Sequence, residues 1–139
     1  MNVVSETITV ETRGFNDMKD LTPFVEEKLA ETRLRQGIVT VFVPGSTGGV
    51  TTIEYEPGLE EDFSRLMEKI APSKLAYDHD RRWGDGNGFS HVRASLLGPS
   101  LTVPFDDGRL QLGTWQQIVF VDFDNRPRKR RIIVQILGE

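Results

Sequence analysis

The sequence predicts an α+β domain in which two main helices pack on a mainly antiparallel β-sheet. Runs of β-branched and aromatic residues outnumber the helical segments, and short turns link the last three of these runs. The chain has 139 residues, of which 37% are hydrophobic, and this is enough for one domain to bury a core. We therefore expect a single domain over residues 1–139.

The first third of the chain predicts a strand, a turn and a helix. β-Branched residues recur over Val3–Glu11, as in a half-buried strand, and Arg13–Asp17 is typical of a turn. Thr22–Pro23 predicts a helix start, with threonine as the N-cap and proline at the first helical position. We expect this helix to run to about Gln36 and to end at Gly37.

The middle of the chain predicts two strands and the second main helix. Ile38–Val43 is a nearly continuous β-branched and aromatic run, which we interpret as a central strand buried on both faces. The polar loop Pro44–Gly49 separates it from a second strand over Val50–Tyr55. Apolar residues at helical spacing then predict a helix over Leu59–Ile70, which Pro72 ends.

The C-terminal part predicts a short helix followed by strands in hairpins. An aspartate–glycine turn and an Asn-Arg-Pro turn each separate two apolar runs, which indicates hairpins. The expected elements are a helix capped near Ser90 and running to Leu97, a strand over Ser100–Pro104, and a C-terminal hairpin of Ile118–Phe123 with Arg131–Leu137.

Composition and charge argue against several classes of function. The chain has no cysteine, which excludes disulfides, thiolate metal sites and a cysteine nucleophile. A formal net charge of −4 argues against broad nucleic-acid binding. No signal-peptide pattern or membrane-length apolar run is present, so we expect a cytoplasmic protein without a membrane partner. We interpret the basic run Arg126–Arg131 as a solvated hairpin turn that leads into an edge strand.

Two long motifs make the second half of the chain recognisable. HVRASLLGPSLTVP begins at His91, and DGRLQLGTWQ begins at Asp107. With Ile38–Glu54 and the closing VQILGE, these motifs resemble the YjbQ-like family, also described as the secondary thiamine-phosphate synthase family. The resemblance implies the YjbQ-like fold and a homotrimer.

The two histidines lie in a stretch rich in Asp, Asn, Arg and Gly, Tyr77–His91. Imidazoles twelve residues apart cannot share one helix face, so a joint site of His79 and His91 requires the loop to fold back. The alternative is that each histidine is a surface or packing residue. By the resemblance, His91 stands where the family carries a histidine before the SLLG segment. We therefore expect His91 as metal ligand and acid–base group, with His79 as a further metal ligand.

Several residues around His91 are candidates for binding. Asp85, with Asp80, offers carboxylates to a divalent metal. Gly86 and Asn87 belong to a glycine-containing turn before a helix, which offers backbone N–H groups to an anion. Arg93 is the candidate clamp for a phosphate. The alternative is a plain loop with solvated arginines.

The chain departs from the family pattern after the central strand. Many members carry a His-Thr-Ser/Thr-Ala segment there, and in this chain Gly45 stands in place of the histidine. This removes one candidate metal ligand. Ser46 and Thr47 are expected either to hydrogen-bond a ligand or to cap the turn. Glu54 matches the family's acidic residue and is expected at the site.

Three classes of function stay open. The resemblance implies a thiamine-phosphate synthase-type transferase, which joins a pyrimidine methyl diphosphate to a thiazole phosphate as pyrophosphate leaves. His91, Asp85 and Glu54 would be its catalytic residues, with a divalent metal, Mg or Zn, as cofactor. The alternative is a trimer that binds a metal or a small anion without efficient catalysis. The third is a structural trimer with a vestigial pocket. The expected partners are a small phosphorylated molecule and further copies of the chain.

Overall fold

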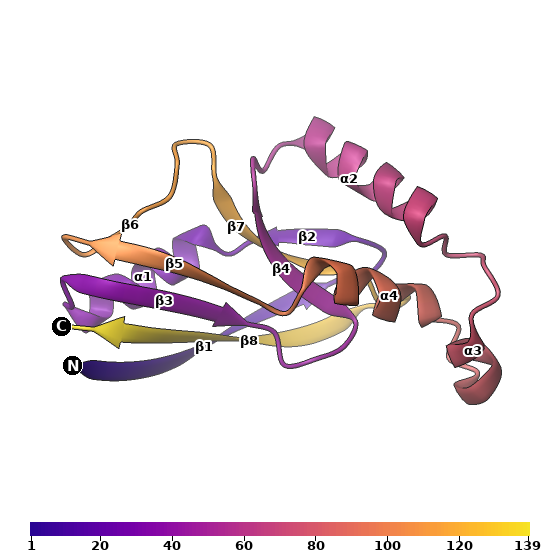
Figure 1. Ribbon diagram of the computed structural model, residues 1–139, viewed down its shortest axis with the longest axis horizontal. Coiled ribbons are helices and arrows are strands. Elements are labelled where there is room, and N and C mark those ends of the chain that lie inside the picture. Colours follow the sequence, from indigo (N-terminus) through magenta and orange to yellow (C-terminus); the bar gives the residue numbers. More distant parts are fainter.

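The computed structural model describes all 139 residues and contains two antiparallel sheets with four helices (Figure 1). The large sheet has the strand order β1-β8-β3-β5-β6, and the small sheet has the order β2-β7-β4. The α+β class is therefore confirmed, with one helix more than the two main helices and the short helix expected. The strands are β1 Asn2–Thr12, β2 Asp17–Asp20, β3 Gln36–Phe42, β4 Gly48–Ile53, β5 Ser100–Asp106, β6 Arg109–Leu110, β7 Gln117–Asp122 and β8 Arg128–Gly138, and the helices are α1 Thr22–Thr32, α2 Pro57–Ile70, α3 Asp78–Trp83 and α4 Gly88–Leu97.

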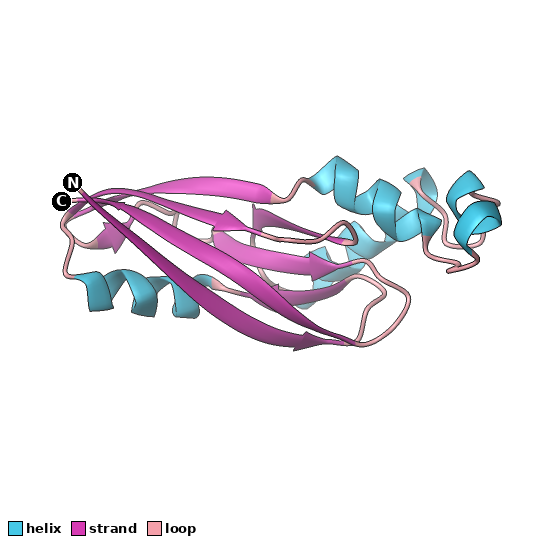
Figure 2. Ribbon diagram, turned by 90° about the horizontal axis from the view of Figure 1, so that it is seen from below, coloured by secondary structure: helices cyan, strands magenta, loops and turns pink.

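The main core lies between the large sheet and a second layer made of α1 and the small sheet. β8 contributes Ile132, Val134 and Ile136, and α1 contributes Val25 and Leu29, all of them buried. The strand residues alternate because successive side chains of a strand point to opposite faces. Figure 2 shows α1 on one side of the strands and the other three helices gathered at the far end of the molecule.

β7 is the strand that is buried on both faces. Ile118 and Phe120 face the main core, whereas Val119 and Val121 face a second cluster that α2 and α4 complete. Ile38–Val43 was predicted from the sequence to be buried on both faces. That prediction is wrong, because the outer face of β3 is exposed, and Ile38 on that face is 41% exposed. No helix or strand covers that outer face.

β7 and β8 do not form the predicted C-terminal hairpin. The turn after Asp122 carries the chain from the small sheet to the large one, where β8 pairs with β1 and β3. β8 is therefore an interior strand, and the basic run does not lead into a sheet edge. Alternation along β8 turns Arg130 into the protein, while Lys129 and Arg131 face solvent.

The boundaries of α1 differ from those predicted. The hydroxyl of Thr22 does not cap the helix but accepts a hydrogen bond from the backbone N–H of Ile118 at 2.8 Å. The helix ends at Thr32 rather than near Gln36. Gly37 lies in β3, where a Cβ would come within 2.0 Å of the Leu137 carbonyl oxygen. This glycine is needed for close packing between strands, not for helix termination.

The polar stretch that the sequence predicts as a loop contains a helix of its own, α3. α4 follows it and begins at Gly88, so Ser90 lies inside the first turn instead of capping the helix. Ser90 is fully buried and donates a hydrogen bond to the carbonyl oxygen of Phe123. This bond ties the start of α4 to the end of β7. None of the four helices combines the length and apolar character that a bilayer crossing requires.

Candidate functional site

The folding of Tyr77–His91 brings the two histidines together. α3 carries His79 and α4 carries His91, and their ring centroids lie 4.3 Å apart with a tilt of 41°. Asp80 closes the loop between the helices, because its Oδ1 accepts a hydrogen bond from the backbone N–H of Gly88 at 2.8 Å. A bend with Gly86 at a positive φ of 67° makes this reversal possible.

Both imidazoles are partly withdrawn from water. Burial lowers the pKa of His91, and the neighbouring His79 lowers it further, against the opposing effect of Asp124, Asp85 and Asp80. A histidine with a lowered pKa is neutral at neutral pH and has one donor and one acceptor nitrogen. Nδ1 of His79 is buried without a hydrogen bond and lies 3.5 Å from Oδ1 of Asp80. The pair is therefore suited to hydrogen bonding, proton transfer or metal ligation.

A pocket of about 200 Å³ lies between His91 and the loop before β4. The loop contributes Gly45 and Ser46, and the first residue of β4 contributes Gly48. α4 with the turn after it contributes the opposite wall. The hydroxyl of Ser95 in that wall donates to the backbone carbonyl of His91 at 2.8 Å. Two segments that lie far apart in the sequence thus form one small cavity. Its full lining is Gly45, Ser46, Gly48, His91, Ala94, Ser95 and Pro99.

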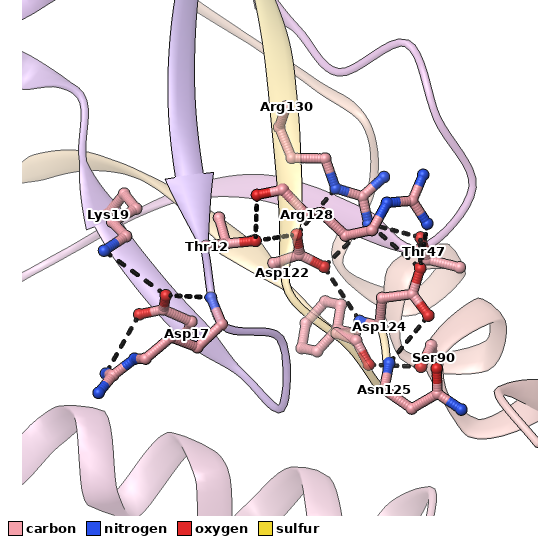
Figure 3. A network of polar contacts seen from close by, with 12 residues as sticks. Thr12, Asp17, Lys19, Thr47, Ser90, Asp122, Asp124, Asn125, Arg128 and Arg130 are labelled. Atoms are coloured by element: carbon pink, nitrogen blue, oxygen red, sulfur yellow. Dashed lines mark hydrogen bonds and ion pairs between the residues drawn. The ribbon is translucent and has the colours of Figure 1, made fainter.

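A buried ionic network, which the sequence did not predict, lies behind the Gly45–Gly48 loop (Figure 3). Asp122 at the end of β7 accepts two hydrogen bonds from Arg130 of β8, from Nε and from Nη2, each at 2.8 Å. It accepts a third from the hydroxyl of Thr12 at 2.6 Å. We call these residues, with Thr47, Asp124 and Arg128, the Asp122–Arg130 network.

Thr47 belongs to this network rather than to the pocket. Its side chain is buried, and its hydroxyl oxygen accepts a hydrogen bond from Nη2 of Arg130 at 2.7 Å and donates to Oδ2 of Asp124 at 3.2 Å. The hydroxyl is thereby committed to protein partners. Thr47 is therefore not a ligand-binding residue in this structure but fixes the loop that carries Gly45 and Ser46.

Asp124 connects the network to α4. Burial raises the pKa of Asp124, but hydrogen bonds from the Asn125 backbone, Asn87 and Thr47 and the charge of Arg128 outweigh burial and hold the pKa below its usual value. Asp124 is therefore a carboxylate at neutral pH. Its Oδ1 accepts from the side chain of Asn87 at 3.2 Å, which anchors the residue just before α4. The network thus sets the position of the helix that carries His91.

The predicted Asp85–Asn87 turn lies on the neighbouring side of α4. Asp85 and Asn87, with Asn125 and Arg126, line an entirely polar cavity of about 180 Å³. The backbone carbonyl of Asp85 accepts from the side chain of Asn125 at 2.9 Å. Gly86 lies between these residues and serves the bend described above.

Arg93 is not available as the predicted phosphate clamp. Only 2% of its surface is exposed, and each of its nitrogens has a protein partner. Nε donates to the Ala71 carbonyl at 3.0 Å, Nη1 to Asn16 at 2.9 Å and Nη2 to Glu68 at 2.8 Å. His91 and Arg93 are two residues apart, about 200° around a helix, and therefore point in opposite directions.

Glu54 is not brought to the histidines. It follows the last residue of β4 and is exposed, whereas the first residue of that strand, Gly48, lines the pocket. Six strand residues at about 3.3 Å each put roughly 20 Å between the two positions. No group of three or more His, Asp and Glu side chains with the arrangement of a metal site occurs in the chain. Of the expected metal ligands, the structure thus brings together His79 and His91, with Asp80 3.5 Å from Nδ1 of His79.

The network had a signal in the sequence. Asp122 and Asp124 are two residues apart at the end of one apolar run, and Arg128 and Arg130 are two residues apart before the next. A spacing of two places both members of each pair on one side of an extended chain. Two acidic and two basic residues with the same spacing on either side of one turn indicate mutual pairing more than solvation. The prediction of a solvated turn did not use this pattern, because all of Arg126–Arg131 was interpreted as one basic segment.

Comparison with known proteins gives consistent matches along the whole chain. The family model described as UPF0047 protein YjbQ-like matches residues 6–139. A UPF0047 protein of Archaeoglobus fulgidus is 42% identical over 130 residues, which cover 94% of this chain and 98% of the relative. YugU of Bacillus subtilis, also described as a UPF0047 protein, is 34% identical over 134 residues, with 96% and 98% covered.

Solved structures show the same fold. A protein of Sulfolobus solfataricus, described as YbjQ-like and of unknown function, superposes with a TM-score of 0.94 at 32% identity, and the match covers 99% of both chains. A YjbQ/UPF0047 family protein of Clostridium acetobutylicum superposes with a TM-score of 0.87 at 32% identity, covering 95% of this chain and 99% of that one.

Proposed function

The chain belongs to the YjbQ-like (UPF0047) family, and on this premise we propose that it binds a small phosphorylated molecule between the Gly45–Gly48 loop and α4. The observation that carries the proposal is the cavity itself, in which His91 faces a glycine- and serine-containing loop. Such loops let a ligand approach the backbone closely. A neutral imidazole adds one donor and one acceptor for phosphate oxygens or for a proton.

The size of the cavity favours binding over synthesis within one subunit. At about 200 Å³ it is smaller than the roughly 300–1,000 Å³ typical of small-molecule sites. A thiamine-phosphate synthase reaction requires two substrates and a leaving diphosphate at one centre. We therefore place small-anion binding first, and the synthase-type reaction second, as an activity that needs an enlarged site. In that reaction His91 is the residue placed to transfer a proton.

A divalent metal at the histidine pair is a second candidate, supported by the 4.3 Å separation of the two rings. Zinc accepts imidazole nitrogens and usually takes four ligands, so His79 and His91 fit half of such a set. Further ligands would have to come from water, from the bound anion or from another subunit, because Asp80, 3.5 Å from Nδ1 of His79, does not complete a group of three ligands. A metal bound there would polarise a phosphoryl oxygen.

We also propose that the protein forms a homotrimer. Cross-strand neighbours Val3, Leu137, Ile38 and Pro104 form an apolar stripe across β1, β8, β3 and β5 on the uncovered face of the large sheet. Val3 is 61% and Ile38 is 41% exposed in the single chain. Contiguous apolar surface of this kind is unusual on a monomer and is buried in closed rings of subunits.

Titration of isotope-labelled protein with inorganic phosphate, followed by backbone and imidazole NMR signals, tests the binding proposal. Saturable shifts are expected at Ser46, His91 and Ser95, and His91→Ala should weaken binding. Thr9→Ala, an exposed change on β1 away from the pocket, is the control and should bind as the native chain does. Saturable shifts confined to other surfaces, or none at all, would refute the proposal.

A parallel zinc titration, with His79→Ala as the variant, tests the metal candidate. Stoichiometric zinc binding that is lost in the variant supports it, whereas equal binding by both proteins argues against it. Turnover of a pyrimidine methyl diphosphate with a thiazole phosphate, measured with Mg²⁺ or Zn²⁺ present, tests the synthase-type reaction separately.

A further inference from the structure

The protein contains two buried arginines, and they differ in one respect. Arg93 has a protein hydrogen bond on each of its three nitrogens. Arg130 uses Nε and Nη2 for Asp122 and Thr47, but its Nη1 has no hydrogen bond to the protein. Only 9% of the Arg130 side chain is exposed. Nη1 is not among the fully buried atoms that lack a partner, so solvent reaches it.

Nη1 of Arg130 lies beside Gly45, which lines the pocket, whereas Arg130 itself lies behind the lining. A Cβ at residue 45 would lie 3.5 Å from Nη1. Apart from Gly45 itself and its two chain neighbours, no other residue has a heavy atom within 4 Å of that Cβ position, so the absence of a side chain leaves the approach to Nη1 open. An acceptor that reaches Nη1 forms a charge-assisted hydrogen bond with it.

We infer that Nη1 of Arg130 is the group that recognises the anionic part of the ligand, a phosphate or another oxyanion, at the Gly45 side of the pocket. The inference rests on the proposed function and names the group that selects the ligand class. The carboxylates of Asp122 and Asp124 occupy the other side of the guanidinium, so its plane and direction are fixed before the ligand arrives. A preorganised donor loses little conformational entropy when it binds.

The arrangement selects a small oxyanion rather than a cation or a neutral group. Nη1 offers two N–H donors and no acceptor, and the guanidinium stays charged at all relevant pH values. Asp122 raises the pKa of Arg130 further through its hydrogen bonds. His91 lies in the opposite wall of the pocket and offers an imidazole nitrogen to the same ligand.

The experiment uses the full chain with labelled arginine and histidine side chains, titrated with inorganic phosphate in the presence of a chelator. The guanidinium signals of Arg130 and the imidazole signals of His91 should shift together, while those of Arg93 stay in place as an internal reference. Gly45→Ala places a methyl group where the anion oxygen would bind and should weaken phosphate binding about tenfold or more.

Gly45→Ala is a mild change for the fold. Gly45 does not have a positive φ, and the nearest atom to the new Cβ would be at ordinary van der Waals distance. Gly113→Ala is the matched control, because that glycine also lacks a positive φ and has its nearest neighbour, in Gln116, at 3.6 Å. The control should bind phosphate as the native chain does, and both variants should melt within a few degrees of it.

Shifts at only one of the two residues, or native affinity in Gly45→Ala, separate the inference from the proposed function. Shifts at His91 without shifts at Arg130, or native affinity in Gly45→Ala, overturn the role of Arg130 and leave the pocket in place. Shifts at Arg130 without shifts at His91 support the anion site and refute the shared pocket. No shift at either residue refutes both.

Discussion

Asp122 and Arg130 form a double hydrogen-bonded ion pair inside the domain, with Nε to Oδ2 and Nη2 to Oδ1 both at 2.8 Å. The pair joins the two sheets, because Asp122 ends β7 in the small sheet and Arg130 lies in β8, an interior strand of the large one. Only 9% of the arginine side chain and none of the aspartate side chain is exposed. Few other polar contacts in the chain are so fully withdrawn from water.

Asp122→Ala should destabilise the protein by about 3–5 kcal/mol, because it leaves the guanidinium of Arg130 buried without its carboxylate. Urea denaturation of the native chain and the variant measures this difference. The control is Asp62→Ala, which breaks a surface pair with Arg65 in α2 whose side chains are 65% and 59% exposed. That change should cost no more than about 1 kcal/mol. Similar losses for the two variants would show that the buried pair contributes little.

Asp124 should make stability depend on acid. Hydrogen bonds and Arg128 outweigh burial and hold its folded-state pKa below the ordinary value of 3.8. A carboxyl with a depressed folded pKa stabilises the fold fully above its unfolded pKa, and this stability is lost as pH falls through the folded pKa. Between about pH 5 and pH 2, the native chain should therefore lose more stability than Asp124→Asn.

Melting temperatures of both proteins across this pH range measure the effect of Asp124. Asp107→Asn, at an exposed position, controls for general acid effects and should follow the native curve. Parallel curves for Asp124→Asn and the native chain would contradict the assignment of Asp124 as a stabilising carboxylate.

The histidine pair should be visible in a titration. Burial and the neighbouring His79 both lower the pKa of His91 from its ordinary value of 6.5. The folded state therefore favours the neutral imidazole, and its contribution to stability is complete above the unfolded pKa and decreases as pH falls below it. His79→Phe keeps a ring in place but removes the charge, so the pKa of His91 should rise towards 6.5 without reaching it. Imidazole NMR signals measure the pKa directly, and an unchanged or lower value in His79→Phe would refute the coupling.

Local pattern was sufficient for much of the fold. Val3–Glu11, Leu59–Ile70 and Ser100–Pro104 were predicted close to β1, α2 and β5, because their hydrophobic periodicity matches one element type. Local pattern did not specify pairing between distant strands. The short turn after Asp122 suggested a hairpin, yet it joins two sheets, since β8 forms its hydrogen bonds with β1 and β3.

The candidate site was predicted in part for the same reason. Proximity of His79 and His91 depends on α3, a helix of six residues that no periodicity indicated. Arg93 could have been excluded from the start, because two helical residues after His91 point to the other side. Glu54 was separated by the length of β4, which the sequence also contained. The role of Arg130 depended on tertiary pairing and could not be read from the basic run alone.

The last prediction concerns the uncovered face of the large sheet. Ile38 lies at the centre of the apolar stripe, paired with Leu137 on one side and Pro104 on the other. Ile38→Lys places a charge in the middle of the proposed subunit contact, where burial of an unpaired charge opposes association. Light scattering should give about three times the 15.7 kDa chain mass for the native protein and a much lower mass for the variant.

Glu27→Lys, an exposed change on α1, should keep the native mass. A native mass near 16 kDa refutes association through this face. A dimer mass retains the argument from exposed apolar surface and refutes the trimer.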